Sequence, residues 1–325
     1  MDDLHREYSA QKIRPIKVED FSVGRHDFYL PLFQASTSAS IQVPFIVVRG
    51  RHEGPTLGIS AAVHGNELNG ILIIQAILEN LDPEQLRGSL VCAPVVNVPG
   101  YNLGKRYFID DVDLNSTFPG KKGGKPSQQY AHIFSKTFLP DLDYLIDIHT
   151  ASQGRLNTMY VRAELESPPA RALAMNMNPE IVLNAKGSDR TLRAAARASG
   201  TPAITVEAGN PSVIQGKMVF QGELGIRNIM NSLSMLGDGV LAVPRRPVLC
   251  SSSEWLRTKN GGLLRAKFQL GDRIKKRQLL AELVSPFGEV LLQYRAPYAG
   301  IVIGMAADPV SIPGTRYCHL GRILD

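Results

Sequence analysis

Hydrophobic positions follow two different patterns along the chain. Between residues 15 and 50, apolar and polar residues alternate, with proline and glycine between the runs. Such alternation is typical of strands with one solvated face, so we expect antiparallel strands at a sheet edge over residues 28–33 and 41–48. From residue 57 onward, continuous apolar runs predict strands buried on both faces. These runs cover residues 57–63, 90–98, 144–148 and 203–206.

Stretches with the apolar spacing of a helix separate several of these runs. They cover residues 70–79, 127–138, 167–176 and 189–199. Buried strands that alternate with helices predict an α/β fold in which helices flank a mixed, mostly parallel sheet. In such sheets, ligands bind beyond the carboxyl ends of the strands, so polar residues at those ends are the first candidates for chemistry.

The hydrophobic pattern changes once more near residue 245. Short β-like runs follow, separated by turn sequences such as Gly261-Gly262 and Pro297-Tyr298-Ala299-Gly300. Short runs at even spacing predict a small all-β barrel-sandwich domain. We therefore expect a larger α/β domain with an N-terminal β segment over residues 1–245, and a β-barrel domain over residues 246–325.

Composition limits the classes of partner. A chain of 325 residues with 44% apolar residues is ordinary for a globular protein with one large and one small domain. The net charge is +6, and the basic residues are scattered apart from Lys121-Lys122 and residues 273–277. These clusters predict solvated turns, so we expect no nucleic-acid surface. A diffuse positive field favours an anionic small-molecule substrate.

The cysteine pattern and the first residues of the chain help to predict the cellular compartment of the protein. The three cysteines, Cys92, Cys250 and Cys318, are far apart and form no C-x-x-C motif. Their spacing argues against a disulfide framework and fits a reducing cytoplasm. The first residues do not form a charged segment followed by an apolar one, and no apolar run approaches the roughly 18 residues of a membrane span. We therefore expect a cytoplasmic protein that does not cross a membrane.

A polar cluster follows the first buried run, where the chain has the sequence His64-Gly65-Asn66-Glu67. His64 and Glu67 are three residues apart, so one ion could contact both if the chain turns there. Gly65 would give the turn backbone freedom, and Asn66 would cap a helix that begins near Glu67. The motif alone is short, and Glu67 could simply stabilise the positive end of that helix.

A second histidine strengthens the hypothesis of a metal site. His149 ends the run over residues 144–148, and Asp147 points to the same face of that strand. Two histidines and a glutamate are a ligand set that holds catalytic zinc and leaves one position open. A carboxylate such as Asp147 often lies behind a ligating histidine, although a buried Asp–His pair without metal would have the same sequence.

Two further polar residues would give such a site its chemistry. Glu207 ends the apolar run over residues 203–206, where a buried carboxylate is costly unless it is paired or functional. Near a metal it could take a proton from water whose pKa the ion lowers, and the alternative is a structural salt bridge. Arg106 could polarise a substrate carbonyl or hold a carboxylate.

Together these residues resemble the succinylglutamate desuccinylase/aspartoacylase family, within the wider zinc-carboxypeptidase-like fold. The matching segments keep the family's order and similar spacing. The segment around residues 267–274 is similar to the family's β-barrel appendage, which resembles biotinyl and lipoyl carrier domains. The matching segments before it are residues 64–67, 97–100, 106, 113–115, 118–120, 147–150 and 205–209.

The resemblance implies a zinc-dependent amidohydrolase with one Zn²⁺ per chain. The metal ligands would be His64, Glu67 and His149. Glu207 would activate water and later protonate the leaving amine, while Arg106 would stabilise the carbonyl oxygen. Asn115 would help to bind the substrate, a small N-acylated amino acid or related amine. By analogy with the family, we also expect a homo-oligomer.

The chain departs from the family pattern at Ser116. The family reads Asp-Leu-Asn-Arg, in which the arginine binds a substrate carboxylate. A neutral serine at that position removes a fixed charge and two hydrogen bonds from the substrate site. Arg155 and Arg162, shortly after His149, are candidates to replace this carboxylate clamp.

Three other functions remain open on the sequence. A carboxypeptidase-like metallopeptidase would share the metal site, but it would need a cation for the C-terminal carboxylate of its substrate. A binding protein that has lost catalysis would fit the change at Ser116, whereas retention of the ligands and Glu207 argues against it. A carrier module would need a lysine at a hairpin tip, and residues 284–295 contain none.

Overall fold

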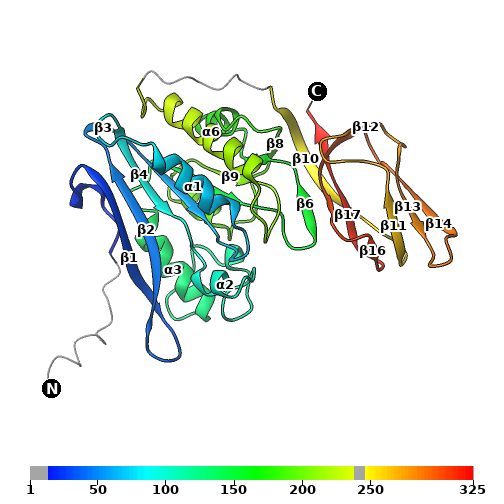
Figure 1. Ribbon diagram of the computed structural model, residues 1–325, viewed down its shortest axis with the longest axis horizontal. Coiled ribbons are helices and arrows are strands. Elements are labelled where there is room, and N and C mark those ends of the chain that lie inside the picture. The colour runs from blue at the N-terminus through cyan, green and yellow to red at the C-terminus, as the bar shows by residue number, and fades with distance from the viewer. Residues whose placement is uncertain (1–13, 238–245, 325) are drawn as a thin grey trace.

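The computed structural model describes residues 14–237 and 246–324, which form a large mixed sheet with helices on both faces and a smaller sheet at one end (Figure 1). The strands of the first two thirds of the chain are β1 Gly24–Gln34, β2 Ser40–Arg49, β3 His52–Ala61, β4 Arg87–Ala93, β5 Tyr144–His149, β6 Arg155–Asn157, β7 Tyr160–Ala163, β8 Ile181–Asn184 and β9 Ala203–Glu207. The helices are α1 Asn69–Glu79, α2 Val98–Asn102, α3 Pro126–Phe138, α4 Pro168–Asn176, α5 Leu192–Ala198 and α6 Gly216–Ser232.

Four neighbouring strands at the centre of the large sheet are parallel, and an antiparallel pair flanks them on each side. Among the described residues the strand order is β1-β2-β4-β3-β5-β9-β7-β8, and the neighbours β4, β3, β5 and β9 all pair in parallel. β1 and β2 form the antiparallel edge predicted from the alternating pattern. The mixed sheet flanked by helices is therefore confirmed, and its parallel part places four strand ends side by side.

Helices cover the two faces of this sheet through two separate apolar cores. On one face α1, α4 and α6 pack against the sheet, with Ile73, Leu173 and Ile226 among the buried residues. On the other face α3 and α5 contribute Phe134 and Leu192 to the second core. In Figure 1, α1 and α6 lie next to each other along the sheet. None of the helices in the described ranges is long and apolar enough to cross a membrane.

The C-terminal segment forms a β-sandwich that is continuous with the large sheet. Its strands are β10 Val248–Arg257, β11 Gly262–Ala266, β12 Arg273–Ile274, β13 Leu279–Val284, β14 Val290–Arg295, β15 Gly300–Ala306, β16 Val310–Ser311 and β17 Arg316–Ile323. β10 pairs in parallel with β8, so β10, β17, β15 and β12 extend the large sheet (Figure 1). The remaining strands form a four-stranded antiparallel sheet in the order β14-β13-β11-β16, and a shared apolar core joins the two layers.

The predicted domain boundary near residue 245 falls at residues 238–245, which lie outside the described part of the chain. The pairing of β8 with β10 is relevant to that boundary, because one backbone ladder joins the two segments. Tyr160, Ile181, Cys250 and Ile303 also share one small core across this junction. The division into residues 1–245 and 246–325 remains a prediction, and the two segments are in extensive contact.

Most predicted elements lie where the apolar pattern indicated, and several elements differ from the prediction. The strand expected over residues 90–98 ends at Ala93, and the chain then enters α2, whose first turn is capped by the Asn97 side chain at 2.9 Å from the Gly100 amide. The sequence analysis also did not predict the short strands β6, β7 and β8, or α6, the longest helix of the described residues.

Candidate active site

The three polar residues predicted at the ends of buried runs, His64, His149 and Glu207, come together at one edge of the sheet. β4, β3, β5 and β9 are neighbours, so the segments that follow them run side by side. His149 and Glu207 are paired in register at the ends of β5 and β9. The Asn97 amide donates to the Ala62 carbonyl just beyond β3, at 2.9 Å. The ends of these strands therefore converge on one region of the molecule.

His64, Glu67 and His149 form a compact buried cluster. The Nδ1 atoms of the two histidines lie 3.2 Å apart, and they face the two oxygens of Glu67 at 2.8 Å and 3.0 Å. One ligand atom from each residue lies within 4.8 Å of the others. Two imidazole nitrogens and a carboxylate oxygen are a donor set suited to Zn²⁺, and they leave room for further ligands.

A tight turn holds His64 and Glu67 together, because the Glu67 amide donates to the His64 carbonyl at 3.0 Å. Gly65 is needed for a different reason than predicted. A Cβ at this position would lie 2.0 Å from the Gly100 carbonyl carbon, so the close approach of α2 excludes a side chain. The predicted cap by Asn66 is wrong, since α1 begins at Asn69 after an uncapped Leu68.

Each histidine of the cluster contacts an aspartate carboxylate through its Nε2 atom. His149 Nε2 lies 2.9 Å from Asp147, as the strand geometry predicted, and the Ser60 hydroxyl donates to Asp147 at 2.8 Å. His64 Nε2 lies 3.0 Å from Asp113. Such carboxylates fix the ring orientation and raise the basicity of the nitrogen that faces a metal. The sequence analysis did not assign this contact to Asp113.

The charges of the cluster favour cations at its centre. Burial opposes ionisation of Glu67, but the charge of His64 outweighs it and holds the Glu67 pKa well below its usual value. Burial likewise opposes protonation of His149, while Asp147 and Glu67 raise its pKa well above the ordinary histidine value. A divalent cation therefore competes with protons for this site.

Arg106 lies directly beside the cluster. Its guanidinium contacts Glu67 at 3.0 Å and Asp113 at 2.8 Å, and its side chain is one-fifth exposed. Asp113 thus links His64 and Arg106, while its backbone position begins a short 3-10 helix over Leu114–Ser116. Arg106 is held where it can face both the cluster and a bound molecule.

Glu207 lies close to the cluster but forms its own contacts. Its carboxylate is 3.4 Å from Arg162 Nε, and Arg162 also donates to the Tyr160 hydroxyl at 2.8 Å. Burial raises the pKa of Glu207, and the charge of Arg162 limits that rise. A raised pKa makes the carboxylate a stronger base once it is ionised.

A cavity of about 280 Å³ opens onto these groups. Both Arg106 and Glu207 line it, together with His64, Glu67 and His149. Asn115 also lines it, and its side chain lies 3.2 Å from His149 Nε2 and accepts the Leu192 amide at 2.9 Å. Ser116 is exposed and does not line the cavity; its hydroxyl donates to the Asp113 carbonyl at 2.6 Å.

Three arginines beyond Arg106 line the same cavity, and they differ in their partners. Arg162 is paired with Glu207, whereas Arg155 stacks on Trp255 with its guanidinium 5.3 Å from the ring centre. Arg193 is 6% exposed, and its one side-chain hydrogen bond among the described residues is a long contact of 3.5 Å to the Lys186 carbonyl. Burial and the charge of Arg162 lower the Arg193 pKa to about 10.

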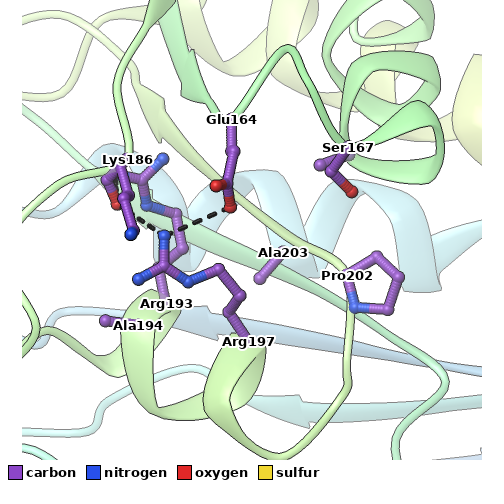
Figure 2. A pocket seen from close by; sticks show the side chains of 9 residues that line it. Glu164, Ser167, Lys186, Arg193, Ala194, Arg197, Pro202 and Ala203 are labelled. Carbon is purple, nitrogen blue, oxygen red and sulfur yellow. Dashed lines mark hydrogen bonds and ion pairs between the residues drawn. The ribbon is translucent and has the colours of Figure 1, made fainter.

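Arg193 also lines a second cavity, which Figure 2 shows, of only about 20 Å³. There Arg197 pairs with Glu164 at 3.2 Å and donates to the Lys186 carbonyl at 3.1 Å. This space accommodates little more than one water molecule, so the large cavity is the candidate site for a substrate.

The C-terminal segment contributes one wall of the large cavity. Trp255 on β10 and His319 on β17 stack with ring centres 4.9 Å apart, and both line the cavity. His319 accepts or donates a 2.8 Å hydrogen bond with Ser253. Burial and the surrounding arginines lower the pKa of His319 to about 3, so the ring is neutral at neutral pH. The sequence analysis did not predict that these residues reach the site.

The chain is similar to one family of known proteins over more than half its length. Residues 53–233 match the model of the succinylglutamate desuccinylase/aspartoacylase catalytic domain. A curated relative from Halomonas elongata, N-alpha-acetyl-L-2,4-diaminobutyric acid deacetylase, is 25% identical over 322 residues, which cover 92% of each chain.

Solved structures share the whole architecture at lower identity. A succinylglutamate desuccinylase from Silicibacter sp. TM1040 superimposes with a TM-score of 0.84 at 23% identity, covering 97% of this chain and all of the other. The product-bound ectoine utilization protein EutE (DoeB) from Ruegeria pomeroyi gives a TM-score of 0.84 at 23% identity, with coverage of 96% and 100%. These similarities include the C-terminal β segment.

Proposed function

The chain belongs to the succinylglutamate desuccinylase/aspartoacylase family, and on that basis we propose that it is a zinc-dependent hydrolase that cleaves the amide bond of a small N-acylated amino acid. The observation that carries this proposal is the buried His64, Glu67 and His149 cluster with Glu207 in the same cavity. Related deacylases act on N-acyl compounds, as the name of the Halomonas elongata relative states.

The donor set fits Zn²⁺, and Asp113 and Asp147 orient the two histidines as carboxylates do behind other zinc ligands. When bound, the ion would act as a Lewis acid on the substrate carbonyl and lower the pKa of water to about 7. Every further step depends on groups of the chain itself.

Glu207 is the residue that we expect to move the protons. Its carboxylate accepts a proton from water as the oxygen adds to the amide carbon, and it returns that proton to the nitrogen as the C–N bond breaks. The products are a carboxylate and an amine. Arg162 supports this exchange, because its contact at 3.4 Å holds one oxygen of Glu207 in place.

Arg106 and Asn115 are expected to hold the substrate at the reacting carbon. The Arg106 guanidinium can donate to the carbonyl oxygen as negative charge develops on it, an effect worth about 3 kcal/mol for one good donor. Its contacts with Glu67 and Asp113 restrict its motion and so lower the cost of ordering it. Asn115 lines the adjoining wall.

Arg193 is the best placed replacement for the carboxylate clamp absent at Ser116. A buried guanidinium is costly unless it is paired, and no carboxylate of the described residues lies within ion-pair distance of Arg193. A substrate carboxylate would supply the missing partner through two hydrogen bonds. Arg155 and Arg162 were the candidates from the sequence, and Arg162 is already engaged with Glu207.

The test is a substrate panel assayed with and without a chelator. N-acetyl and N-succinyl derivatives of several amino acids, including N-acetyl-2,4-diaminobutyrate, are compared with short peptides. We expect chelator-sensitive release of free amine from N-acyl amino acids. Hydrolysis of peptides alone would favour the carboxypeptidase-like alternative, and chelator-insensitive turnover would contradict both.

A further inference from the structure

A row of apolar side chains crosses all four strands of the small C-terminal sheet. Val310 on β16 is paired with Leu263 on β11. Leu263 is paired in turn with Val284 on β13, and Val284 is paired with Val290 on β14. Residues that are directly paired across antiparallel strands point to the same face of a sheet. These four residues therefore form one continuous row, which we call the outer apolar row.

The outer apolar row lies on the face of the sheet that points away from the apolar core. The neighbouring row consists of Leu264, Leu283 and Leu292, which are paired with one another and belong to the core or pack against it. Successive residues of a strand point to opposite faces, so the outer apolar row faces outward. Figure 1 shows that β11, β13 and β14 lie at the end of the molecule opposite β1.

Most of this row is open to solvent. Val310, Val290 and Leu263 are 66%, 52% and 41% exposed. Next to them, Phe287 in the turn between β13 and β14 is 91% exposed, and Ile312 directly after β16 is 70% exposed. Monomeric proteins rarely expose contiguous apolar patches of more than a few hundred Å², and larger patches mark interaction surfaces.

Two opposite charges lie beside the outer apolar row on the same face. Arg265 on β11 is directly paired with Glu282 on β13. Arg265 is exposed and forms no salt bridge among the described residues, whereas Glu282 contacts Lys267 at 3.2 Å and accepts Gln293 at 3.3 Å. The two charges occupy the two middle strands of the sheet at the same level along the strands.

This arrangement is complementary to a second copy of itself. Consider two copies packed face to face, related by a two-fold axis that runs parallel to the strands and midway between β11 and β13. The rotation places β11 of one copy over β13 of the other and keeps the level along the strands. The outer apolar rows then meet, and Arg265 of each copy faces Glu282 of the other. A two-fold interface requires such a self-complementary surface.

We propose that the outer face of the four-stranded sheet is an interface between two copies of this chain. At about 4.8 Å between strands and about 3.3 Å per residue, four strands of up to six residues cover about 400 Å². This face is smaller than the roughly 800 Å² per partner of a standard interface, so we expect a reversible dimer. The interface is separate from the proposed function, because none of its described residues lines the substrate cavity.

Sedimentation velocity over a range of protein concentrations tests this proposal. We expect the unmodified protein to dimerise with a dissociation constant of about 10 µM, and therefore use concentrations from about 1 µM to about 300 µM. Leu263→Lys should weaken the dimer about tenfold or more, because it buries a charge in the apolar contact. Phe220→Lys is the matched control, since Phe220 is 64% exposed on α6 and should leave the dimer unchanged.

Charge reversal tests the two-fold arrangement itself. Arg265→Glu and Glu282→Arg each place like charges opposite one another, and each variant alone should dimerise about tenfold or more weakly. An equal mixture of the two variants should recover the dimer, because the two acidic side chains of one variant then face the two basic side chains of the other. Circular dichroism checks that both variants fold, and recovery on mixing cannot come from a change of fold.

Three results would overturn the proposal. The first is an unmodified protein that stays monomeric up to the highest concentration. The second is self-association that is unchanged in Leu263→Lys and in both charge-reversal variants, which would place the contact elsewhere. The third is a mixture of Arg265→Glu and Glu282→Arg that associates no more strongly than either variant alone.

Discussion

Asp113 offers a sharp test of how the proposed metal site is built. One of its oxygens lies 3.0 Å from His64 Nε2 and accepts the Asn115 amide at 2.9 Å, while the other accepts Arg106 at 2.8 Å. Burial opposes its ionisation, but contacts with His64 and Arg106 hold its pKa well below the ordinary value. Asp113 is therefore ionised at any pH at which the protein would be assayed.

The substitution Asp113→Asn preserves the shape of this side chain and removes its charge. An asparagine has one oxygen and one NH₂ group, so in either orientation a donor meets another donor, at Arg106 or at His64 and the Asn115 amide. Loss of the carboxylate behind a metal-binding histidine typically weakens metal affinity 10- to 100-fold. That range corresponds to about 1.4 to 2.7 kcal/mol, and we expect a value within it.

Competition with a chromophoric chelator measures the affinity for Zn²⁺ directly, and thermal melting followed by circular dichroism checks that the variant folds. Asp111→Asn is the matched control, because Asp111 is exposed and has a φ of +55°, which asparagine also adopts readily. An Asp113→Asn variant that binds Zn²⁺ as tightly as the original protein would refute this account of the site, as would an equal loss in Asp111→Asn.

Three further predictions follow from the same geometry. Glu207→Gln should retain the metal, as measured by elemental analysis, yet lower kcat about 10²- to 10⁴-fold; an unaffected rate would remove Glu207 as the base. Dialysis against a chelator should abolish activity until Zn²⁺ is restored. The affinity for Zn²⁺ should fall as pH falls, because the raised pKa values of His64 and His149 let protons compete with the ion. An affinity that does not depend on pH would argue against these two residues as ligands. The pKa of His319 falls from 6.5 to about 3 on folding, so the unfolded chain takes up a proton below pH 6.5 that the folded protein does not. Between pH 8 and pH 5 this difference contributes a loss of about 2 kcal/mol, which the raised pKa values of His64 and His149 oppose in both proteins. The change in unfolding free energy over that range, measured by urea unfolding, should therefore be about 2 kcal/mol less favourable for the original protein than for His319→Asn, and an equal change in both would contradict the prediction.

The site residues that could be predicted from the sequence are those whose positions follow from nearby residues of the chain. His64 and Glu67 are joined by one turn, and His149 and Glu207 each end a short apolar run. A continuous apolar run identifies a strand that is buried on both faces. The carboxyl ends of parallel strands lie at the same edge of the sheet, where ligands bind. Such residues can be placed near one another before the strand order is known.

Asp113 could not be assigned to His64 in the same way. It reaches the site only because residues 98–116 fold back across the strand ends, which depends on the Asn97 cap and on the 3-10 helix that begins after Asp113. Both features depend on hydrogen bonds between polar groups that are a few residues apart, and many loops contain such bonds. Nothing in the local spacing indicates which histidine the carboxylate will meet.

The sequence analysis did not predict α6 because two residues in the interior of this helix disfavour helical structure. Gly222 and Gly225 lie in its interior, where glycine disfavours a helix by about 1 kcal/mol each. A Cβ at Gly222 would lie 2.3 Å from the Ile73 side chain of α1, and one at Gly225 would lie 2.3 Å from the Met177 carbonyl oxygen. The glycines that weaken the helix in isolation therefore allow it to pack closely against its neighbours.

The charge of the cavity could not be predicted from the sequence. Its arginines are spread over the chain, and a net charge of +6 gives no sign that four of them line one cavity. Folding pairs Arg106 and Arg162 with carboxylates and leaves Arg155 and Arg193 without them. A positively charged cavity of this kind destabilises the folded protein and is neutralised when an anionic ligand binds. Under the proposed function, the unpaired arginines would therefore decide which N-acyl compound binds, because His64, Glu67 and His149 would serve every amide equally.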